Sequence, residues 1–359
     1  MLMKEEFYAI GLMSGSSLDG LDICYIRFLV SGFRFEYEIL QADCIEYTNE
    51  FRERLRNAPN LSAFEFAKLH AELGKYFGQL TNDFIKQNEI EKLDFICSHG
   101  QTIFHQPNLG FTTQIGCGAQ IAAQTNCKVI CDLRTSDVAN AGQGAPIVPI
   151  AERYLFSAYK VFLNIGGIAN IAFHEDNKVK AYDVCAANTL LNYFAKQKGL
   201  AYDKDGNLAR SGNIILPLLD ELNNIVFCKQ AAPKSLGTEH IVNDWLPLFD
   251  KYETTIEDKL ATAVEHIAMQ VAKAIKSEIR NLNSEILITG GGALNSFLVE
   301  RIQHHVSIKV KVPDVLTIQY KEALAMAFIG LLRILEIPNC LASVTGAKKD
   351  VVGGAVYLP

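Results

Sequence analysis

The sequence predicts a duplicated α/β fold with a ligand site in the cleft between two lobes. The chain has 359 residues, which is too long for one compact core and suits two domains of ordinary size. Apolar residues make up 49% and charged residues 21%, as in a globular protein. The order of strands and helices expected in the first half starts again roughly 150 residues later. Because the space between two such lobes is a natural place for a ligand, we expect the functional site there.

The first half, expected to form a lobe over residues 1–150, opens on an antiparallel meander of three strands joined by turns. Ser62 and Glu65 form a capping box, and apolar residues recur at helical spacing from Phe66 to Phe84, which predicts a long helix. The other expected elements are strands at 7–12, 21–28, 33–42, 94–97 and 128–131, and a helix at 118–124.

The second half repeats this order over residues 151–339, with an insertion around 200–255. The segment 340–359 is expected to join the first lobe, and Pro146 and Pro149 mark the boundary between the lobes. The expected strands are 160–164, 168–173, 179–182, 285–289 and 308–312, and the expected helices begin near 187 and cover 256–280, 293–304 and 319–335.

Charge and hydropathy exclude two classes of protein. Thirty-four basic and forty acidic residues give a net charge of −6, so there is no cationic excess to bind a nucleic acid as the main partner. The longest strongly apolar uncharged run, 161–173, is broken by Gly166 and Gly167 and is too short to span a membrane. No signal peptide is expected, because the chain begins Met-Leu-Met-Lys-Glu-Glu and then enters an expected strand.

The cysteines and histidines predict neither disulfides nor a zinc site. The nine cysteines are scattered and contain no C-x-x-C pair, which is typical of reduced core thiols in a cytoplasmic protein. The eight histidines show no metal-ligand spacing. We therefore expect a cytoplasmic protein without a zinc centre.

A Gly- and Ser-rich turn between the first two strands is the first candidate site. Glycines let backbone N–H groups converge on an anion, and hydroxyl groups add donors. Two aspartates there suit a magnesium ion beside a phosphate, so Asp19 and Asp22 are candidate metal ligands. An ordinary Gly/Ser turn is the alternative. The candidate phosphate-binding residues are Gly15, Ser16, Ser17, Leu18, Asp19, Gly20 and Asp22.

Two further glycine turns lie in the second half. Gly166 and Gly167 occupy the matching hairpin, and two such hairpins facing each other would hold a polyphosphate chain from both sides. The run Gly290, Gly291 and Gly292, with Asn295, joins a strand to a helix and suits an adenosine moiety or its α-phosphate. The run lacks the dinucleotide fingerprint, and a purely structural role is the alternative.

Asp183 is the candidate general base. It follows an expected strand, where a carboxylate would point into the cleft and take a proton from water or from a sugar hydroxyl. The alternative is that Asp183 is a helix N-cap.

Two polar clusters suit the binding of a sugar substrate. Arg134 in one of them could bind a carboxylate or phosphate group of a ligand, and the alternative is that it forms a surface ion pair. These candidate substrate residues are His99, Gln101, Thr102, Arg134, Asp137 and Gln143.

The ordered motifs resemble those of one enzyme family. Duplicated lobes with two phosphate hairpins and a later glycine turn suggest the actin-like, ribonuclease H-like ATPase fold of sugar kinases. The run 13–22 resembles the M-S-G-T-S-L-D-G-x-D signature of the anhydro-N-acetylmuramic acid kinases. The other runs that resemble this family are 99–102, 142–149, 164–170, 202–206, 233–235, 290–292 with Asn295, 322–323 and 343–347.

The resemblance implies a kinase that uses ATP and Mg²⁺. The substrate would be 1,6-anhydro-N-acetylmuramic acid, whose internal ether bridge is opened by water while O6 receives the γ-phosphoryl group, in cell-wall recycling. By analogy Asp183 activates the water, Glu322 assists, Asn188 belongs to the substrate residues, and a homodimer is possible.

One departure from the family pattern leaves alternatives open. The family has Asp-x-Gly-Pro-Gly-Asn where this chain has 183–188, so Cys185, Ala186 and Ala187 replace two glycines and a proline. Their Cβ atoms restrict φ and narrow the expected pocket floor. A kinase for a different amino sugar, or a non-catalytic protein that binds a sugar or nucleotide, are therefore the alternatives.

Overall fold

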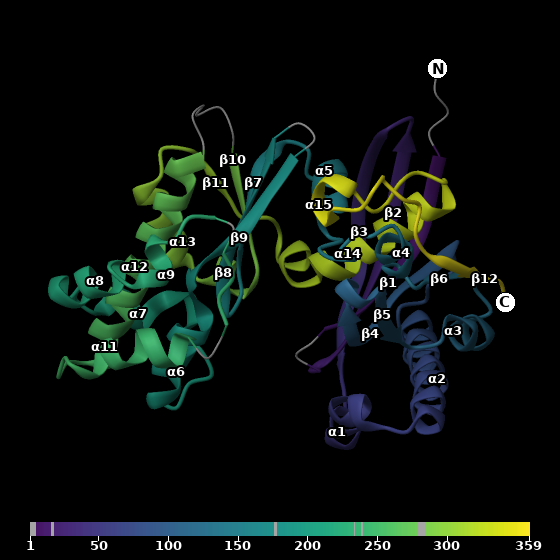
Figure 1. Ribbon diagram of the computed structural model, residues 1–359, viewed down its shortest axis with the longest axis horizontal. Coiled ribbons are helices and arrows are strands. Elements are labelled where there is room, and N and C mark those ends of the chain that lie inside the picture. Colours follow the sequence, from purple (N-terminus) through teal and green to yellow (C-terminus); the bar gives the residue numbers. More distant parts are fainter. Residues whose placement is uncertain (1–4, 16–17, 176–177, 233, 238–239, 279–284) are drawn as a thin grey trace. The chain divides into compact units, whose positions relative to one another are not determined.

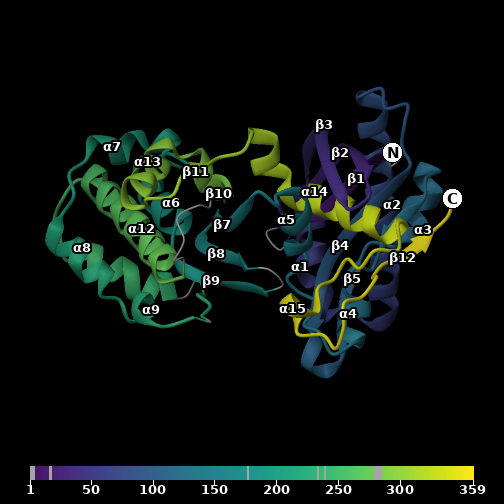
Figure 2. The same cartoon turned by 90° about the horizontal axis from the view of Figure 1, so that it is seen from above.

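The computed structural model describes residues 5–15, 18–175, 178–232, 234–237, 240–278 and 285–359. The chain divides into two compact units, drawn in Figures 1 and 2. Unit 1 comprises Met1–Ser157 and Tyr320–Pro359, and unit 2 comprises Ala158–Gln319. The C-terminal part of unit 1 thus begins at Tyr320, whereas the sequence led us to assign only 340–359 to the first lobe.

Unit 1 is built on a mixed seven-stranded sheet of order β12-β6-β4-β1-β2-β3, with β5 paired to β4. The first three strands form the expected antiparallel meander, β4 runs parallel to β1, and β6 runs parallel to β4. The strands are β1 (Glu5–Ser14), β2 (Gly20–Ser31), β3 (Arg34–Glu46), β4 (Phe95–Gln106), β5 (Phe111–Ile115), β6 (Val129–Cys131) and β12 (Ala355–Tyr357).

Helices cover this sheet, and the expected capping box begins the longest of them. Ser62 Oγ accepts a hydrogen bond of 3.2 Å from the Glu65 amide at the start of α2. The helices of unit 1 are α1 (Asn49–Asn57), α2 (Ala63–Gln87), α3 (Gly118–Thr125), α4 (Thr135–Ala139), α5 (Pro149–Leu155), α15 (Ala342–Thr345) and the greater part of α14 (Val315–Ile334), with short 3₁₀ turns at Ala58–Asn60 and Pro107–Leu109.

Unit 2 repeats the strand arrangement of unit 1. Its five-stranded sheet has the order β11-β10-β7-β8-β9, which corresponds strand for strand to β6-β4-β1-β2-β3. Again the first three strands are antiparallel and the last two run parallel to the first. This confirms the predicted duplicated, actin-like fold class. The strands are β7 (Tyr159–Ile165), β8 (Ile168–Glu175), β9 (Lys178–Ala186), β10 (Glu285–Thr289) and β11 (Val310–Lys311).

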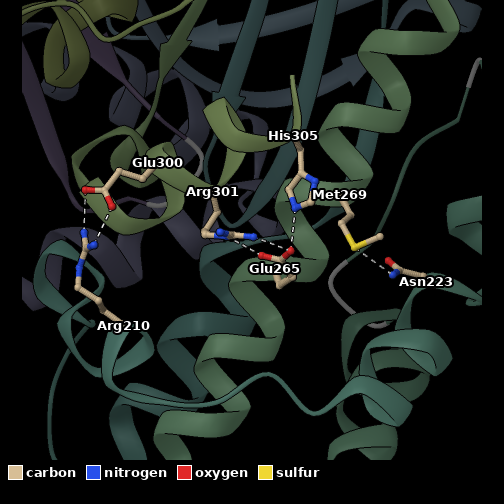
Figure 3. Close-up of polar contacts among 7 residues, drawn as sticks. All are labelled: Arg210, Asn223, Glu265, Met269, Glu300, Arg301 and His305. Carbon is tan, nitrogen blue, oxygen red and sulfur yellow. Dashed lines mark hydrogen bonds and ion pairs between the residues drawn. The ribbon is translucent and has the colours of Figure 1, made fainter. Parts of the chain in front are cut away.

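The core of unit 2 forms around α12, most of whose apolar side chains are buried. Glu265 of α12 accepts hydrogen bonds from Arg301 and His305 of α13, and Arg210 of α7 pairs with Glu300 of α13 (Figure 3). The helices are α6 (Asn188–Gln197), α7 (Asn207–Ser211), α8 (Leu216–Asn223), α9 (Val226–Lys229), α11 (Leu246–Asp250), α12 (Ile256–Glu278) and α13 (Ser296–His305), with a π-helix at Ile241–Trp245 and 3₁₀ turns at Lys204–Gly206 and Gly291–Leu294.

Several expected boundaries were wrong. β11 covers only Val310–Lys311 rather than 308–312, and α14 begins at Val315 rather than at 319. β4 does not end at Cys97 but continues to Gln106, because its second half pairs with β5, a strand that the sequence analysis missed. β9 continues to Ala186, and α13 begins at Ser296 after a 3₁₀ turn. Pairing with β5 extends β4 and pairing with β8 extends β9, whereas the side chain of Asn295 sets the start of α13 by accepting from the Leu298 amide.

Helix α14 is the one helix, within the described residues, that is long and apolar enough to cross a membrane. Of its most apolar window 67% is buried inside the structure, and its side chains from Ala323 to Leu332 form part of the core. This burial is typical of a central helix in a globular unit. The helix is interrupted at Tyr320, whose φ of −114° and ψ of 18° are not helical.

Candidate functional site

In unit 1, a pocket of about 360 Å³ lies at the end of β1, between β4, the loop after β6 and α14. It brings together residues from four motifs that are far apart in the sequence, including four of the predicted substrate residues. The lining residues are Met13, Ser14, Gly15, His99, Gln101, Thr102, Arg134 and Glu322.

Arg134 is held in this pocket by neutral acceptors. Its Nε donates to His99 Nε2 at 2.9 Å, and its Nη1 donates to the Gly144 carbonyl at 2.7 Å. The His99 ring donates from Nδ1 to the Gly100 carbonyl at 2.9 Å. Burial and the Arg134 charge lower the pKa of His99 to about 4, so the imidazole is neutral. The charge of Arg134 is therefore available to bind an anion. Among the described residues Arg134 forms no ion pair with a carboxylate, so the alternative of a surface ion pair is wrong.

Ser14 and Gln101 are joined inside the sheet. Ser14 Oγ donates to Gln101 Oε1 at 2.5 Å and accepts from Tyr47 OH at 2.7 Å. All three side chains are buried. The bonds link the end of β1 to β4, so that the backbone entering the Gly/Ser turn has a defined position. Ser16 and Ser17, two of the predicted phosphate ligands, lie outside the described residues.

Three carboxylates stand near the same turn. Burial raises the pKa of Asp22, a hydrogen bond with Cys44 lowers it, and the neighbouring Asp19 raises it again. Burial and the charge of Asp22 raise the pKa of Glu322. Desolvated carboxylates that repel each other favour a bound cation. Within the described chain no group of three His, Cys, Asp or Glu residues forms a metal site, so a Mg²⁺ ion here would need oxygens from a phosphate ligand and water.

Glycine at position 11 sets the position of Glu322. A Cβ atom on Gly11 would stand 1.9 Å from the Ala323 carbonyl oxygen, so only glycine allows α14 to lie this close to β1. Glu322 precedes that carbonyl in α14 and is thereby brought to the pocket.

Three of the predicted substrate residues do not line the pocket: Asn188, which belongs to unit 2, and Asp137 and Gln143 of unit 1. Asp137 is fully buried, and its carboxylate accepts from Thr345 Oγ1 and from the Gly144 amide, both at 2.8 Å. The aspartate thus holds the loop whose Gly144 carbonyl accepts from Arg134. Gln143 is exposed, and its backbone N–H donates to the backbone carbonyl of Thr345.

Unit 2 contains a second pocket, of about 420 Å³. It contains Gly291 and Asn295 of the third glycine motif together with Asn188, which we had expected among the substrate residues. Leu294 and Tyr202 offer exposed apolar surface there, with 40% and 60% of their side chains accessible. The lining residues are Asn188, Leu191, Asn192, Tyr202, Asp203, Lys204, Asp205, Gly291, Leu294 and Asn295.

The segment 202–205 lines this pocket, although its resemblance to the family pattern assigns it no role. The sequence signal for this segment was the Asp203-Lys204-Asp205-Gly206 turn: Asp203 accepts from the amides of Leu208 and Ala209, and a Cβ on Gly206 would stand 2.3 Å from Asn295 Oδ1. This close approach brings the turn against the start of α13.

The glycine turns of unit 2 have packing roles. Gly290 has a φ of +79°, and a Cβ on Gly292 would stand 2.2 Å from Ile165 Cγ2, so both are required by contact with β7. The Gly167 carbonyl accepts from the amides of Ala187 and Thr189, and the Gly166 carbonyl accepts from that of Asn188. The first hairpin of unit 2 therefore caps the N-terminus of α6.

Asp183 lies inside β9, opposite Asn170 of β8. Its Oδ2 accepts from Ser235 Oγ at 3.1 Å and from the Leu236 amide at 2.8 Å. The N-cap alternative is wrong, because Ala187 occupies that position in α6. Asp183 is therefore a half-buried carboxylate on a strand, with one oxygen oriented by a neighbouring segment.

Comparison with known proteins decides the family. The family model of anhydro-N-acetylmuramic acid kinase matches residues 7–359. The chain belongs to this family. Curated relatives of that name come from Picosynechococcus (34% identical, covering 98% of this chain and 99% of the relative) and from Haemophilus influenzae (33% identical, 99% and 98%). A third comes from Hydrogenovibrio crunogenus (32% identical, 98% of each). The family consists of phosphotransferases with an alcohol group as acceptor.

Among solved structures, component A of the (R)-2-hydroxyglutaryl-CoA dehydratase of Acidaminococcus fermentans has a TM-score of 0.45. It is 14% identical, and the match covers 89% of this chain and 96% of that one.

Proposed function

We propose that this protein is the ATP-dependent kinase that opens 1,6-anhydro-N-acetylmuramic acid and phosphorylates its O6, in cytoplasmic recycling of cell-wall sugars. The observation that carries the proposal is the family match, which extends over residues 7–359. Supporting it, residues from three of the runs that resemble the family, among them His99 and Glu322, converge on the unit 1 pocket.

The proposed reaction couples ring opening to phosphoryl transfer. Water attacks C1 of the sugar and the bond between C1 and O6 breaks. O6 then bonds to the γ-phosphorus of ATP, whose bond to the bridging oxygen breaks, so that ADP leaves. Asp183 accepts the proton of the water as general base, which is typically worth about 10²- to 10⁴-fold in rate. The hydrogen bonds from Ser235 and Leu236 orient one oxygen of this carboxylate.

The nucleotide and its metal ion are assigned to separate residues. The unit 2 pocket, with Tyr202, Leu294 and Gly291, would take the nucleoside. The Gly/Ser turn after β1 would hold phosphate oxygens, and Asp19, Asp22 and Glu322 would lie near Mg²⁺, which neutralises charge on the transferred group when bound. The raised pKa values of Asp22 and Glu322 support a cation at this turn.

The unit 1 pocket would recognise the sugar through neutral and cationic donors. Arg134 offers a guanidinium that none of the described carboxylates neutralises by a direct ion pair, and it suits the lactyl carboxylate of the substrate. Gln101 and Thr102 are hydrogen-bonding partners for hydroxyl or amide groups.

The departure at 185–187 is compatible with activity. Cys185, Ala186 and Ala187 are each 0% exposed and belong to the unit 2 core. Their side chains therefore fill core space rather than project into the unit 2 pocket, which none of them lines. This favours the family reaction over a loss of catalysis.

Replacement of Asp183 by asparagine tests the proposed base. The Asp183→Asn variant should bind ATP as the wild type does, because Asp183 is not among the residues that line the unit 2 pocket. Its turnover should fall by about 10²-fold or more. The measurement is formation of N-acetylmuramic acid 6-phosphate from the anhydro sugar, ATP and Mg²⁺, followed by mass spectrometry, with nucleotide binding measured by calorimetry.

Ser235→Ala is the matched control. It removes one hydrogen bond to the same carboxylate but keeps the base, so most of the activity should remain. Turnover of Asp183→Asn at the wild-type rate would exclude this role, and turnover of the wild type with ordinary amino sugars only would exclude the proposed substrate.

A further inference from the structure

Unit 2 contains a further pocket of about 260 Å³, which is lined by four lysines. It shares no lining residue with the pocket proposed for the nucleoside. We call it the lysine pocket. It lies between β9, the end of α9 and the C-terminal half of α12, which are neighbours in both views (Figures 1 and 2). The lysines are Lys180, Lys229, Lys234 and Lys273, and the one lining carboxylate belongs to Glu278.

Only one of these lysines has a carboxylate partner within the described residues. Lys180 Nζ pairs with Glu278 at 2.6 Å. Lys234 Nζ instead donates to the Phe227 carbonyl at 3.0 Å, and Lys273 Nζ donates to the Cys228 carbonyl at 3.2 Å. These are successive carbonyls in the last turn of α9. Each ammonium group has three donors, so each of the two retains donors for a ligand.

The charges of this pocket are not balanced. Lys234 is half-buried and packs over the Phe227 ring at 4.5 Å. Its pKa is lowered by burial, and the nearby Lys273 lowers it further, although buried cysteines and Asp183 act in the opposite direction. Lys273 is exposed, so the free-energy cost of holding two cations close together without an anion falls mainly on the half-buried Lys234. A negatively charged ligand would remove this cost.

We propose that the lysine pocket binds a small oxyanion, a phosphate or carboxylate group, through Lys234 and Lys273. Lys229, which is exposed at the rim, adds to the positive field that attracts the ligand. The volume of the pocket suits a small anionic molecule rather than a macromolecule. The inference does not depend on which sugar the protein phosphorylates.

A ligand bound in the lysine pocket would restrain the segment that contacts Asp183. The Lys234 carbonyl accepts from the Asp183 amide at 3.1 Å, and the Leu236 amide donates to the Asp183 carboxylate. The segment 234–236 thus has its first side chain in the lysine pocket and its backbone against Asp183. An anion that holds Lys234 restrains this segment, so its amides should exchange hydrogen more slowly.

Titration of inorganic phosphate into the full chain tests the proposal. Calorimetry should detect phosphate binding that weakens about tenfold in Lys273→Gln, which keeps a donor but loses the charge. Lys276→Gln is the matched control, because Lys276 is an exposed residue of the same helix that does not line the pocket, and this variant should bind as the wild type does. Acetate at the same ionic strength separates carboxylate from phosphate recognition.

Hydrogen exchange gives a second readout that does not depend on catalysis. Phosphate should slow exchange of the amides at 234–237 in the wild type and in Lys276→Gln, but not in Lys273→Gln. The proposal is overturned if neither anion binds, or if the two lysine variants bind phosphate equally. It is also overturned if binding is lost when ADP saturates the protein, since the phosphate would then occupy the nucleotide site.

Discussion

At the scale of single residues, the three consecutive glycines of unit 2 differ in what they contact. Gly290 combines a φ of +79° with a Cβ position 2.6 Å from Asn164 Oδ1, and the Cβ position of Gly292 lies 2.2 Å from Ile165. At Gly291 the nearest atom is Asn188 Nδ2 at 3.7 Å, an ordinary van der Waals distance. The run therefore combines two glycines required by packing with one that faces the pocket.

Alanine substitutions should separate these roles. Gly292→Ala forces a side chain into β7 and should lower the free energy of unfolding by about 1–3 kcal/mol. Gly291→Ala meets no close atom and should change it by no more than about 0.5 kcal/mol. Chemical denaturation of both variants is the measurement, and equal destabilisation would show that the packing at Gly292 is not the reason for its glycine.

At the scale of elements, one ion-pair cluster holds the helix that follows the glycine turn. Glu265 is 6% exposed and accepts from Arg301 at 2.7 and 2.9 Å and from His305 at 2.7 Å. The Arg210 to Glu300 pair on the same helix has similar distances but is exposed to solvent (Figure 3). Because water competes for exposed charges, the two pairs should contribute unequally.

Glu265→Gln should lower the free energy of unfolding by about 1.5–3 kcal/mol, since it weakens hydrogen bonds between charged groups. Burial acts to raise the pKa of Glu265, but the hydrogen bonds and charges of Arg301 and His305 outweigh it and lower the pKa below 4.5. A carboxylate with a lowered folded-state pKa stabilises above its ordinary value and loses that effect as the pH falls through the lowered value.

The stability difference between the wild type and Glu265→Gln should therefore be full at pH 6 and shrink below pH 4.5. Urea denaturation over this range is the measurement. Glu300→Gln is the control and should leave the denaturation midpoint almost unchanged. A difference that grows with acidification would contradict the proposed ion pair.

At the scale of the whole molecule, each unit has its own hydrophobic core. One core is formed around β7 to β10 and α12, and the other around β1, β2, β4 and α2. The single tryptophan, Trp245, is fully buried in the first of these and donates from Nε1 to His266 at 3.2 Å. Its fluorescence reports on unit 2 alone.

Two separate cores should give unfolding that is not two-state. In a urea titration, the fluorescence of Trp245 and the far-ultraviolet circular dichroism, to which both units contribute, should give transitions with different midpoints. The Trp245→Phe variant is the control for the fluorescence signal. Coincident curves for the two probes would mean that the units unfold as one.

Local signals in the sequence were sufficient for most elements. The capping box at Ser62, the helical spacing from Phe66 to Phe84 and the two meanders needed only neighbouring residues, and the structure confirms them. The continuation of β4 beyond Cys97 could not be predicted, because it depends on pairing with β5. In the candidate site, too, the glycine motifs could be recognised from neighbouring residues. The hydrogen-bond partners of Arg134 and Asp137 could not be predicted, because they include residues of distant segments.

By itself the sequence determined the duplicated α/β class, the family and the residue types available for chemistry, because periodicity, turn residues and ordered motifs are properties of neighbouring positions. Only the tertiary structure decided which polar groups face a pocket. The carboxylate of Asp137 accepts a hydrogen bond from Thr345, 208 positions away, and is buried. Arg134 bonds only to neutral acceptors and keeps its charge for a ligand. Burial and hydrogen-bond partners depend on segments that meet only when the chain folds, and these determine which side chains are left to bind a ligand.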